Sequence, residues 1–372
     1  MGTDHGDVDP GAGARDEAAD PDRISYLPDH LLHDILIRLP GTADAARTSM
    51  LSRRWRRVWA HTPVISLHYR CEFEPESPGG RVPDRVDAAL AAHAAGAGAT
   101  TSTVSLSRLE ITLPFESSTH LRTDRIAAWL HVAAQRLAGE LRITLPFCLR
   151  SSAKDDDDGD GEVLLPLCER ATSISLDLSD RTLQFALPPA GGVFKALATL
   201  TIRFACLRGR ELEAAVSSSR CPCLKKLVID WIMLQQDDGD GDGDGDGDGD
   251  GDGDGDGDGD GDGACDLSIR SDSLEWLEIS YAVRLNGWLR VHAPNLQTFH
   301  PCIRCDLCVL APKLSEVRWS SGHAYDSSRH HLARAGHQLR RLEVEADSSG
   351  FALMRQFNTV DELHLTVNLT RV

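Results

Sequence analysis

Four residues in the C-terminal third have types and spacings that could bind a metal ion. His300, Cys302, Cys305 and Cys308 follow one another at intervals of two or three positions, and Cys-x-x-Cys spacing suits a tetrahedral zinc site. However, no distant second pair of such ligands completes the set, and the cysteines fall where a repeating apolar pattern predicts buried side chains. We therefore predict small buried thiols, with no metal and no cofactor.

The acidic tract from Asp237 to Gly263 is a second candidate, with 14 Asp and 13 Gly in 27 positions. Its alternation is similar to the beginning of a calcium-binding loop. The glutamate that closes such a loop is absent, however, and strict alternation defines no cage. The composition instead predicts a disordered loop that cannot contribute to a core. A shorter acidic insert at 155–161 is interpreted in the same way.

The sequence contains no Gly-x-Ser-x-Gly, P-loop or His-Glu-x-x-His motif, so we predict that the protein is not an enzyme. Its net charge of −18 falls to −4 without the acidic tract, which argues against nucleic-acid binding. No apolar run approaches the roughly 18 residues of a membrane helix, and the N-terminus lacks the pattern of a secretory signal. The expected location is the nucleus, the cytoplasm or both.

A repeated apolar pattern predicts the elements that would position a binding surface. From about residue 104 onward, units of the form apolar-x-x-apolar-x-apolar recur nine times. They begin at Ala138, Ala171, Leu197, Leu224, Leu274, Leu296, Leu314, Leu339 and Val360. Without the two acidic inserts the starts are about 18–27 residues apart, close to the spacing of leucine-rich repeats. We predict an irregular α/β solenoid over 104–372, with an ordinary mixed α/β domain as the alternative.

In each unit, the apolar residues of a short strand would face the core, and the intervening residues would face outwards on a concave surface. The outward residues are therefore the candidates for substrate binding. We single out Arg203, Lys226, Trp276, Glu278, Arg341 and Glu343. Aromatic residues often anchor protein partners, which favours Trp276, although this residue could equally fill the repeat.

The remaining N-terminal part divides into three segments by composition. Residues 1–22 are rich in Asp, Gly and Ala and predict a disordered tail. Residues 23–62 predict a compact helical block. Residues 63–103 are expected to form a linker with one Ala-rich helix at about 86–99.

The helical block predicts three short helices. The first begins at Pro28 and carries apolar residues at helical spacing. The second covers 45–51, and the third covers 53–60 with Ser52 as its N-cap. A unit this small usually depends on a partner, a metal or a disulfide for stability. No metal or disulfide pattern is present in it, so we infer a partner surface.

The residues of this block resemble a known motif. They read Leu27-Pro28-x-x-Leu31-Leu32-x-x-Ile35-Leu36-x-x-Leu39-Pro40 and then Arg47-Thr48-Ser49-x-Leu51-Ser52-Arg53-Arg54-Trp55-Arg56-x-Val58-Trp59. This resembles the F-box, in the form found in plant F-box/leucine-rich-repeat proteins, including the F-box/FBD/LRR type. Asp124-Arg125-Ile126-x-x-Trp129-Leu130, followed by Glu140-Leu141-x-Ile143, is similar to the helix and strand that open the repeats in that family.

The resemblance implies a non-catalytic adaptor. F-box proteins dock on the Skp-family linker of a Skp–cullin–F-box (SCF) ubiquitin ligase, and through it on cullin, while the second domain holds a protein substrate. By this analogy the linker-binding residues are among Leu27, Pro28, Leu32, Ile35, Leu36, Leu51 and Trp55, some of which would instead fill the three-helix core. Such an adaptor raises the local concentration of substrate near a conjugating enzyme.

Two alternatives stay open at this stage. The chain could be a non-ligase protein-binding module, or a truncated competitor that binds the linker without presenting substrate. Relatives often continue into a further C-terminal domain, whereas this sequence ends seven residues after its last repeat strand. The resemblance therefore puts the completeness of the C-terminus in question, and the residues do not decide it. The residues indicate neither the substrate nor any small-molecule co-ligand.

Overall fold

The computed structural model describes most of the chain between residues 23 and 366. The described ranges are 23–39, 48, 50–69, 82–97, 105–114, 121–145, 162–186, 192–235, 265–282, 285–302, 304–319, 325–333, 339–345 and 348–366. The predicted tail at 1–22 and the two predicted acidic loops lie outside these residues.

The N-terminal helices form a small unit with its own core. A short 3-10 helix, η1 (Arg23–Tyr26), precedes α1 (Asp29–Arg38), and α3 (Arg53–Ala60) follows. The side-chain oxygen of Ser52 accepts a hydrogen bond from the backbone N–H of Trp55 at 3.3 Å, which confirms the predicted N-cap. The predicted helix at 45–51 lies mostly outside the described residues. The core of this unit consists of Leu32, Leu36, Trp55, Val58 and Trp59.

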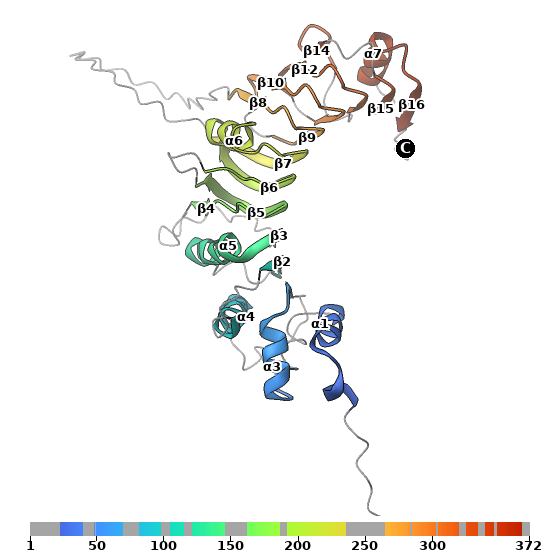
Figure 1. The fold of residues 1–372 in the computed structure, drawn as a ribbon. Helices are drawn as coiled ribbons and strands as arrows, with labels where there is room; N and C mark the ends of the chain where they lie inside the picture. Colours follow the sequence, from blue (N-terminus) through green and yellow to red (C-terminus); the bar gives the residue numbers. More distant parts are fainter. Residues whose placement is uncertain are drawn as a thin grey trace, which may run out of the picture.

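A sheet of twelve strands, here called sheet A, runs through the rest of the molecule, and every strand pairing in it is parallel. The spatial order is β1 (Val64–His68), β2 (Leu106–Thr112), β3 (Leu137–Thr144), β5 (Ser173–Phe185), β6 (Thr199–Arg208), β7 (Lys226–Gln235), β9 (Trp276–Ser280), β11 (Thr298–Cys302), β13 (Glu316–Trp319), β15 (Arg341–Glu345) and β16 (Glu362–Thr366), with β4 (Val163–Leu165) beside β5. Chain order and spatial order agree, so the strands stack one upon the next (Figure 1).

The nine predicted strands are neighbours in this sheet, from β3 to β16. Their register matches the apolar pattern, because Leu141, Ile174, Leu200 and Leu227 are aligned across four adjacent strands and all are buried. Parallel neighbours with aligned apolar residues bury one continuous layer. The sheet begins earlier than predicted, since β1 lies inside the expected linker and pairs with β2.

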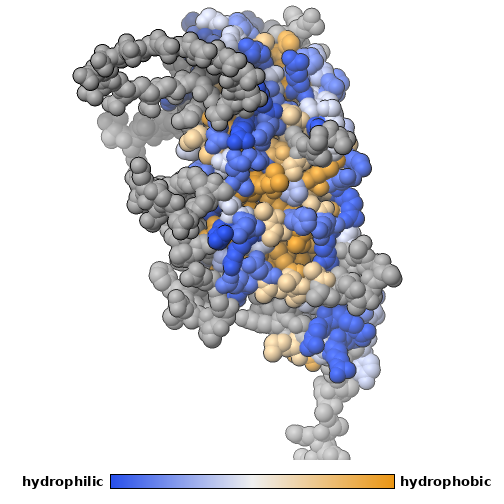
Figure 2. Space-filling view, turned by 90° about the vertical axis from the view of Figure 1, so that its left-hand side faces the viewer, coloured by the Kyte–Doolittle hydropathy of each residue, from blue (hydrophilic) through white to orange (hydrophobic). Residues whose placement is uncertain are grey.

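A second parallel sheet, here called sheet B, was not predicted. Its order is β14 (His330–Ala333), β12 (Asp306–Leu310), β10 (Trp288–His292) and β8 (Leu267–Arg270). Helices α4 (Val82–Ala97), α5 (Thr123–Arg136) and α6 (Gly209–Val216) lie on the same side of sheet A in the N-terminal half, and α7 (Ser348–Gln356) lies near the C-terminal end (Figure 1). On this side, apolar surface gathers in a band between hydrophilic flanks (Figure 2).

Helix α4 joins the N-terminal helices to sheet A. The rings of Trp59 in α3 and His93 in α4 meet edge to face, with centroids 6.0 Å apart. His93 Nε2 donates a hydrogen bond to the Thr62 carbonyl at 3.0 Å. On the other side, Trp129 Nε1 of α5 donates to Asp87 Oδ1 at 2.6 Å. These contacts connect the two parts of the molecule through one helix.

Candidate protein-binding surfaces

The N-terminal helices expose large apolar side chains that are not part of their core. Among the described residues of this unit, seven large apolar side chains are at least 38% exposed: Ile24, Tyr26, Leu31, Ile35, Ile37, Met50 and Leu51. We call them together the apolar face, meaning the exposed apolar surface of this unit; on α1, Leu31 and Ile35 lie one turn apart, whereas Ile37 lies on the other flank of the helix. Leu51 is 70% exposed and Met50 is 84% exposed. Exposed apolar groups at this density mark a surface that binds a partner.

The structure separates the seven residues predicted for linker binding into two groups. Pro28, Ile35 and Leu51 are exposed, and Leu27 is half-buried against the core. Leu32, Leu36 and Trp55 are buried and form most of the five-residue core of the unit. They therefore fill this core, which was the alternative to a role in linker binding. Five members of the apolar face were missed by the prediction, because an apolar helical stripe does not reveal where the core ends.

Arg54 holds the edge of this face in place. Its guanidinium donates to Asp29 Oδ1 from two nitrogens, at 2.7 and 3.0 Å, and to the carbonyl oxygen of Leu27. The hydrogen bond from Arg54 lowers the pKa of the Asp29 carboxyl below its usual value. Because these bonds connect α3 to the start of α1, they order the segment that contains Leu27 and Pro28.

The outer face of sheet A carries rows of polar side chains, aligned across the strands. One row contains Lys226, Trp276 and Arg341, the next contains Glu278 and Glu343, and the third contains Arg203. All six residues predicted for substrate binding therefore lie on one face, with Trp276 adjacent to Lys226 across β7 and β9. The alternation of outward and buried residues along each strand places them there.

Charges on this face are arranged in cross-strand ion pairs. Arg318 Nε lies 2.8 Å from Glu316 Oε1 and 3.2 Å from Glu343 Oε2, so one guanidinium serves two carboxylates on neighbouring strands. Arg341 Nε approaches the same Glu316 carboxylate at 3.8 Å. Neighbouring strands are thus matched in charge across the face, which favours this strand register.

Trp276 is surrounded by cations and by one imidazole. The ammonium of Lys226 lies 4.5 Å from the centroid of the indole, and the guanidinium of Arg318 lies 5.6 Å from it. The His300 ring packs edge to face at 4.7 Å, and burial lowers the pKa of this imidazole below its usual value. Among the described residues, Trp276 Nε1 and His300 Nε2 are buried without a hydrogen-bond partner.

A hollow of about 210 Å³ lies beside this cluster on the same face. Its lining includes Glu278, His300, Arg318 and Glu343, from four neighbouring strands. The hollow is small and mostly polar, so it fits one side chain of a protein partner better than a large cofactor.

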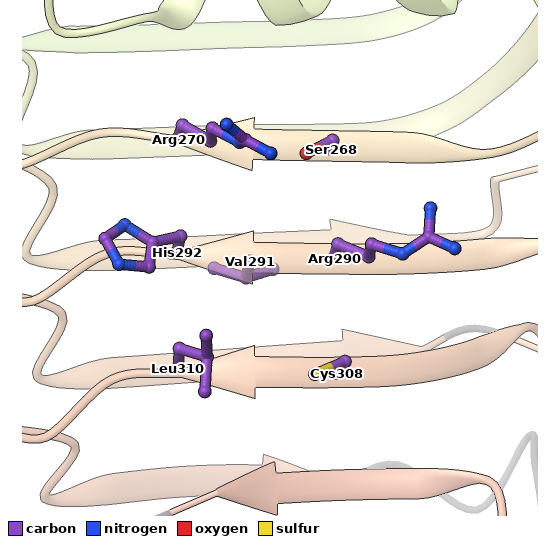
Figure 3. Close-up of a pocket in the computed structure, with 7 residues that line it drawn as sticks. All are labelled: Ser268, Arg270, Arg290, Val291, His292, Cys308 and Leu310. Atoms are coloured by element: carbon purple, nitrogen blue, oxygen red, sulfur yellow. The ribbon is translucent and has the colours of Figure 1, made fainter.

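A second hollow, of about 350 Å³, lies on the outer face of sheet B and was not predicted (Figure 3). Arg270 and His292, which are register partners, stand at the ends of β8 and β10, beside Leu310 of β12. Arg290 is engaged by Asp266 at 3.0 Å. This surface is weakly basic, because one of its two guanidiniums is already paired.

The three clustered cysteines are distributed over two sheets. Cys302 ends β11 of sheet A, whereas Cys308 lies in β12 of sheet B, and burial raises the pKa of the Cys305 thiol to about 12. Within the described residues, no three His, Cys, Asp or Glu side chains are grouped so that they could hold a metal ion.

No described helix is both long and apolar enough to cross a membrane.

Comparison with known proteins identifies the N-terminal unit. Residues 24–66 match the family model of the F-box domain, so the helices and the apolar face belong to an F-box. The relatives named next carry this domain together with repeats. An F-box/LRR-repeat protein of Arabidopsis thaliana is 29% identical over 213 residues, which cover 56% of this chain and 38% of that relative.

Two further relatives from Arabidopsis thaliana match over shorter stretches. F-box/LRR-repeat protein 25 is 52% identical over 48 residues, covering 13% of this chain and 19% of the relative. An F-box/FBD/LRR-repeat protein is 56% identical over 46 residues, covering 12% and 10%. The predicted resemblance to plant F-box/leucine-rich-repeat proteins is therefore confirmed. Proteins of this kind are generally non-catalytic adaptors that bind Skp-type linkers.

Proposed function

We propose that this chain is the substrate-recognition adaptor of an SCF-type ubiquitin ligase. In this role the F-box docks on a Skp-family linker, and through it on cullin. Sheet A, as part of a leucine-rich-repeat solenoid, binds a protein substrate rather than a nucleic acid or a membrane. We further propose that the protein works in the nucleus, the cytoplasm or both. The single observation that carries the proposal is the apolar face of the F-box.

The apolar face has the properties that a permanent partner requires. Leu51 and Met50 precede α3 and are largely exposed, and Ile35 and Leu31 are one turn apart on α1. Covering one such side chain contributes about 1.5–3 kcal/mol. The five-residue core beneath the face is small, so burial of the face by a linker would also stabilise the F-box itself.

The outer face of sheet A supports the second half of the proposal by a different property. Its charges are already matched within the sheet, while Trp276 Nε1 and His300 Nε2 have no partner among the described residues. The aligned charges of this face discriminate between partners of complementary charge and partners of like charge. Selective recognition of one substrate is the expected result.

Co-purification of the full chain with a plant Skp-family linker tests the docking. The wild-type chain should form a one-to-one complex, and an Ile35→Ser/Leu51→Ser double variant should bind roughly a hundredfold more weakly, because two exposed anchors are lost. Asp34→Ala is the control for a change on the exposed surface of α1, since Asp34 is exposed but is not one of the seven apolar residues. A folded wild-type F-box that binds no linker would contradict the proposal.

A further inference from the structure

Three aromatic side chains form a stack on neighbouring strands of sheet A. Phe204 in β6, Trp231 in β7 and Tyr281 after β9 occupy equivalent positions, each following a residue of one aligned row. The rings of Phe204 and Trp231 are 6.0 Å apart at 18°, and those of Trp231 and Tyr281 are 4.5 Å apart at 22°. We call these three residues the aromatic ladder.

The backbone of the ladder adopts a conformation that aromatic residues rarely take. The φ angles of Phe204, Trp231 and Tyr281 are 46°, 51° and 51°, in the left-handed region. For residues with a β-carbon this conformation costs about 1–2 kcal/mol each. Glycine or asparagine at these positions would avoid most of that cost.

The left-handed turn places the rings of Trp231 and Tyr281 on the outside of the molecule, while Phe204 is half-buried beside them. Arg203 and Asp230 before the ladder face outwards, and Ala205 and Ile232 after it are buried, so the ladder residue is an extra outward residue in each strand. Trp231 is therefore 49% exposed, and Tyr281 is 47% exposed. The strain is not compensated by full burial, which points to a functional role for the exposed rings.

The surroundings of the ladder are acidic. Asp177, Asp180 and Asp230 lie beside it, and Arg203, whose Nε is 3.7 Å from Asp230 Oδ2, is the cation that acts on both Asp177 and Asp230. Partial burial raises the pKa of Asp177 to about 6, with Asp180 and Asp230 contributing in the same direction. The three carboxylates outnumber the one guanidinium, that of Arg203, that acts on Asp177 and Asp230, so acidic groups predominate beside the ladder.

We propose that the aromatic ladder binds an extended segment of a protein substrate, in which a proline or another apolar residue lies next to a lysine or arginine. This inference rests on the proposed function and names the class of substrate. The apolar residue would pack on the exposed ring edges, as in the aromatic grooves that bind extended proline-rich segments. The cationic residue would pair with the carboxylates of Asp180 and Asp230.

The same geometry disfavours other occupants. An acidic or phosphorylated segment would meet three carboxylates and would be repelled. Met233, which is 40% exposed on β7, extends the apolar surface beyond Trp231 along the strand. The ladder therefore offers a ridge that crosses three strands, with its charges at one flank, and an extended segment matches this shape.

Fluorescence anisotropy with two labelled heptapeptides tests the inference on the full chain, co-purified with a Skp-family linker. The basic probe has the sequence SRPLRPS and the acidic probe has the sequence SDPLDPS. We expect saturable binding of the basic probe, and binding of the acidic probe that is at least roughly tenfold weaker. The inference is overturned if the basic probe does not saturate by about 1 mM, or if both probes bind equally.

Two substitutions at one position separate the ring from the backbone. Trp231→Ala and Trp231→Gly both remove the indole, but glycine keeps the left-handed turn without strain. Both variants should weaken binding of the basic probe by at least roughly tenfold. If the glycine variant binds as well as wild type, the ring is not the anchor and the inference fails. Phe351→Ala, at an aromatic residue of α7 that is 55% exposed, should leave binding unchanged.

Linker binding on the same samples keeps this inference distinguishable from the proposed function. A chain that binds the linker but ignores the basic probe overturns the substrate class and leaves the adaptor role intact. A chain that binds the basic probe through Trp231 but fails to bind the linker supports the ladder and contradicts the adaptor role.

Discussion

The F-box and sheet A place their apolar and polar groups in opposite ways. In the F-box, five residues form the core, while seven large apolar side chains are exposed. In sheet A, the buried layer continues from strand to strand, and the outer face carries aligned charged rows in which Glu316 contacts both Arg318 and Arg341. The described part of the F-box thus exposes more large apolar side chains than its core contains, whereas sheet A buries a continuous apolar layer and pairs many charges of its outer face within the sheet.

The difference indicates two modes of association. An exposed apolar face gains free energy in proportion to the area covered, and this gain depends little on salt. A face of exposed ion pairs gains little net free energy on binding, but it rejects partners with the wrong charges. We infer that the F-box contact is strong and permanent, and that contacts on sheet A are weaker and selective.

The largest expected difference between the two regions is a loss of stability in the F-box alone, after removal of a leucine side chain from its small core. Leu36→Ala leaves a cavity beside Leu32 and Trp55, and such changes cost about 2–5 kcal/mol. We expect amide hydrogen exchange to accelerate throughout α1 and α3 while sheet A keeps its protection. Equal loss of protection in both regions would mean that they unfold as one unit, and the comparison would then fail.

The junction between the regions should respond to acid. Burial lowers the pKa of His93 to about 4, from an ordinary value near 6.5. Because the folded state resists protonation, the free energy of unfolding should fall as the pH drops from 6.5 to 4, by at most about 3 kcal/mol. Urea unfolding of wild type and His93→Gln at several pH values measures how much His93 contributes to the pH dependence of the free energy of unfolding. Parallel pH profiles for the two proteins would exclude His93 as the cause.

A smaller effect of opposite sign is expected within sheet A. The folded pKa of Asp177, about 6, exceeds its ordinary value of 3.8, so its ionisation opposes folding as the pH rises from 4 to 6. Asp177→Asn should therefore stabilise the protein by about 1 kcal/mol at pH 7, after allowance for partial exposure. The gain should vanish below pH 4. A destabilised variant at pH 7 would show that the hydrogen bond from the Ser179 N–H outweighs the cost of the charge.

Parts of this fold could be predicted because the apolar pattern is sufficient to define them. Leu200 and Ile202 occupy the second and third apolar positions of their unit, and both are buried in β6 as expected. Strand β1 could not be found in this way, because its alternation stands alone in a segment without a repeat. Strand β10 of sheet B, which contains Leu289 and Val291, lacks the preceding apolar anchor on which the pattern depends, because Asn286 stands at that position.

The candidate sites were harder to predict for a different reason. Leu31 and Leu32 are adjacent, equally apolar and part of one stripe, yet one is exposed and the other is fully buried. Only the position of α3 decides between them. The aromatic ladder has no sequence signal at all, because the left-handed backbone at Trp231 is normally associated with glycine.

The direct succession of α3 and β1 has a geometrical consequence. Strand β1 begins four residues after the last residue of α3, and β9 is its sixth neighbour along sheet A. Strands lie about 4.8 Å apart, so the ladder and the F-box are separated by a whole number of such steps, up to ~29 Å. Inserting or deleting one strand between them would shift a bound substrate by ~4.8 Å without altering either surface. The number of strands in sheet A thus sets the distance between the F-box and the aromatic ladder.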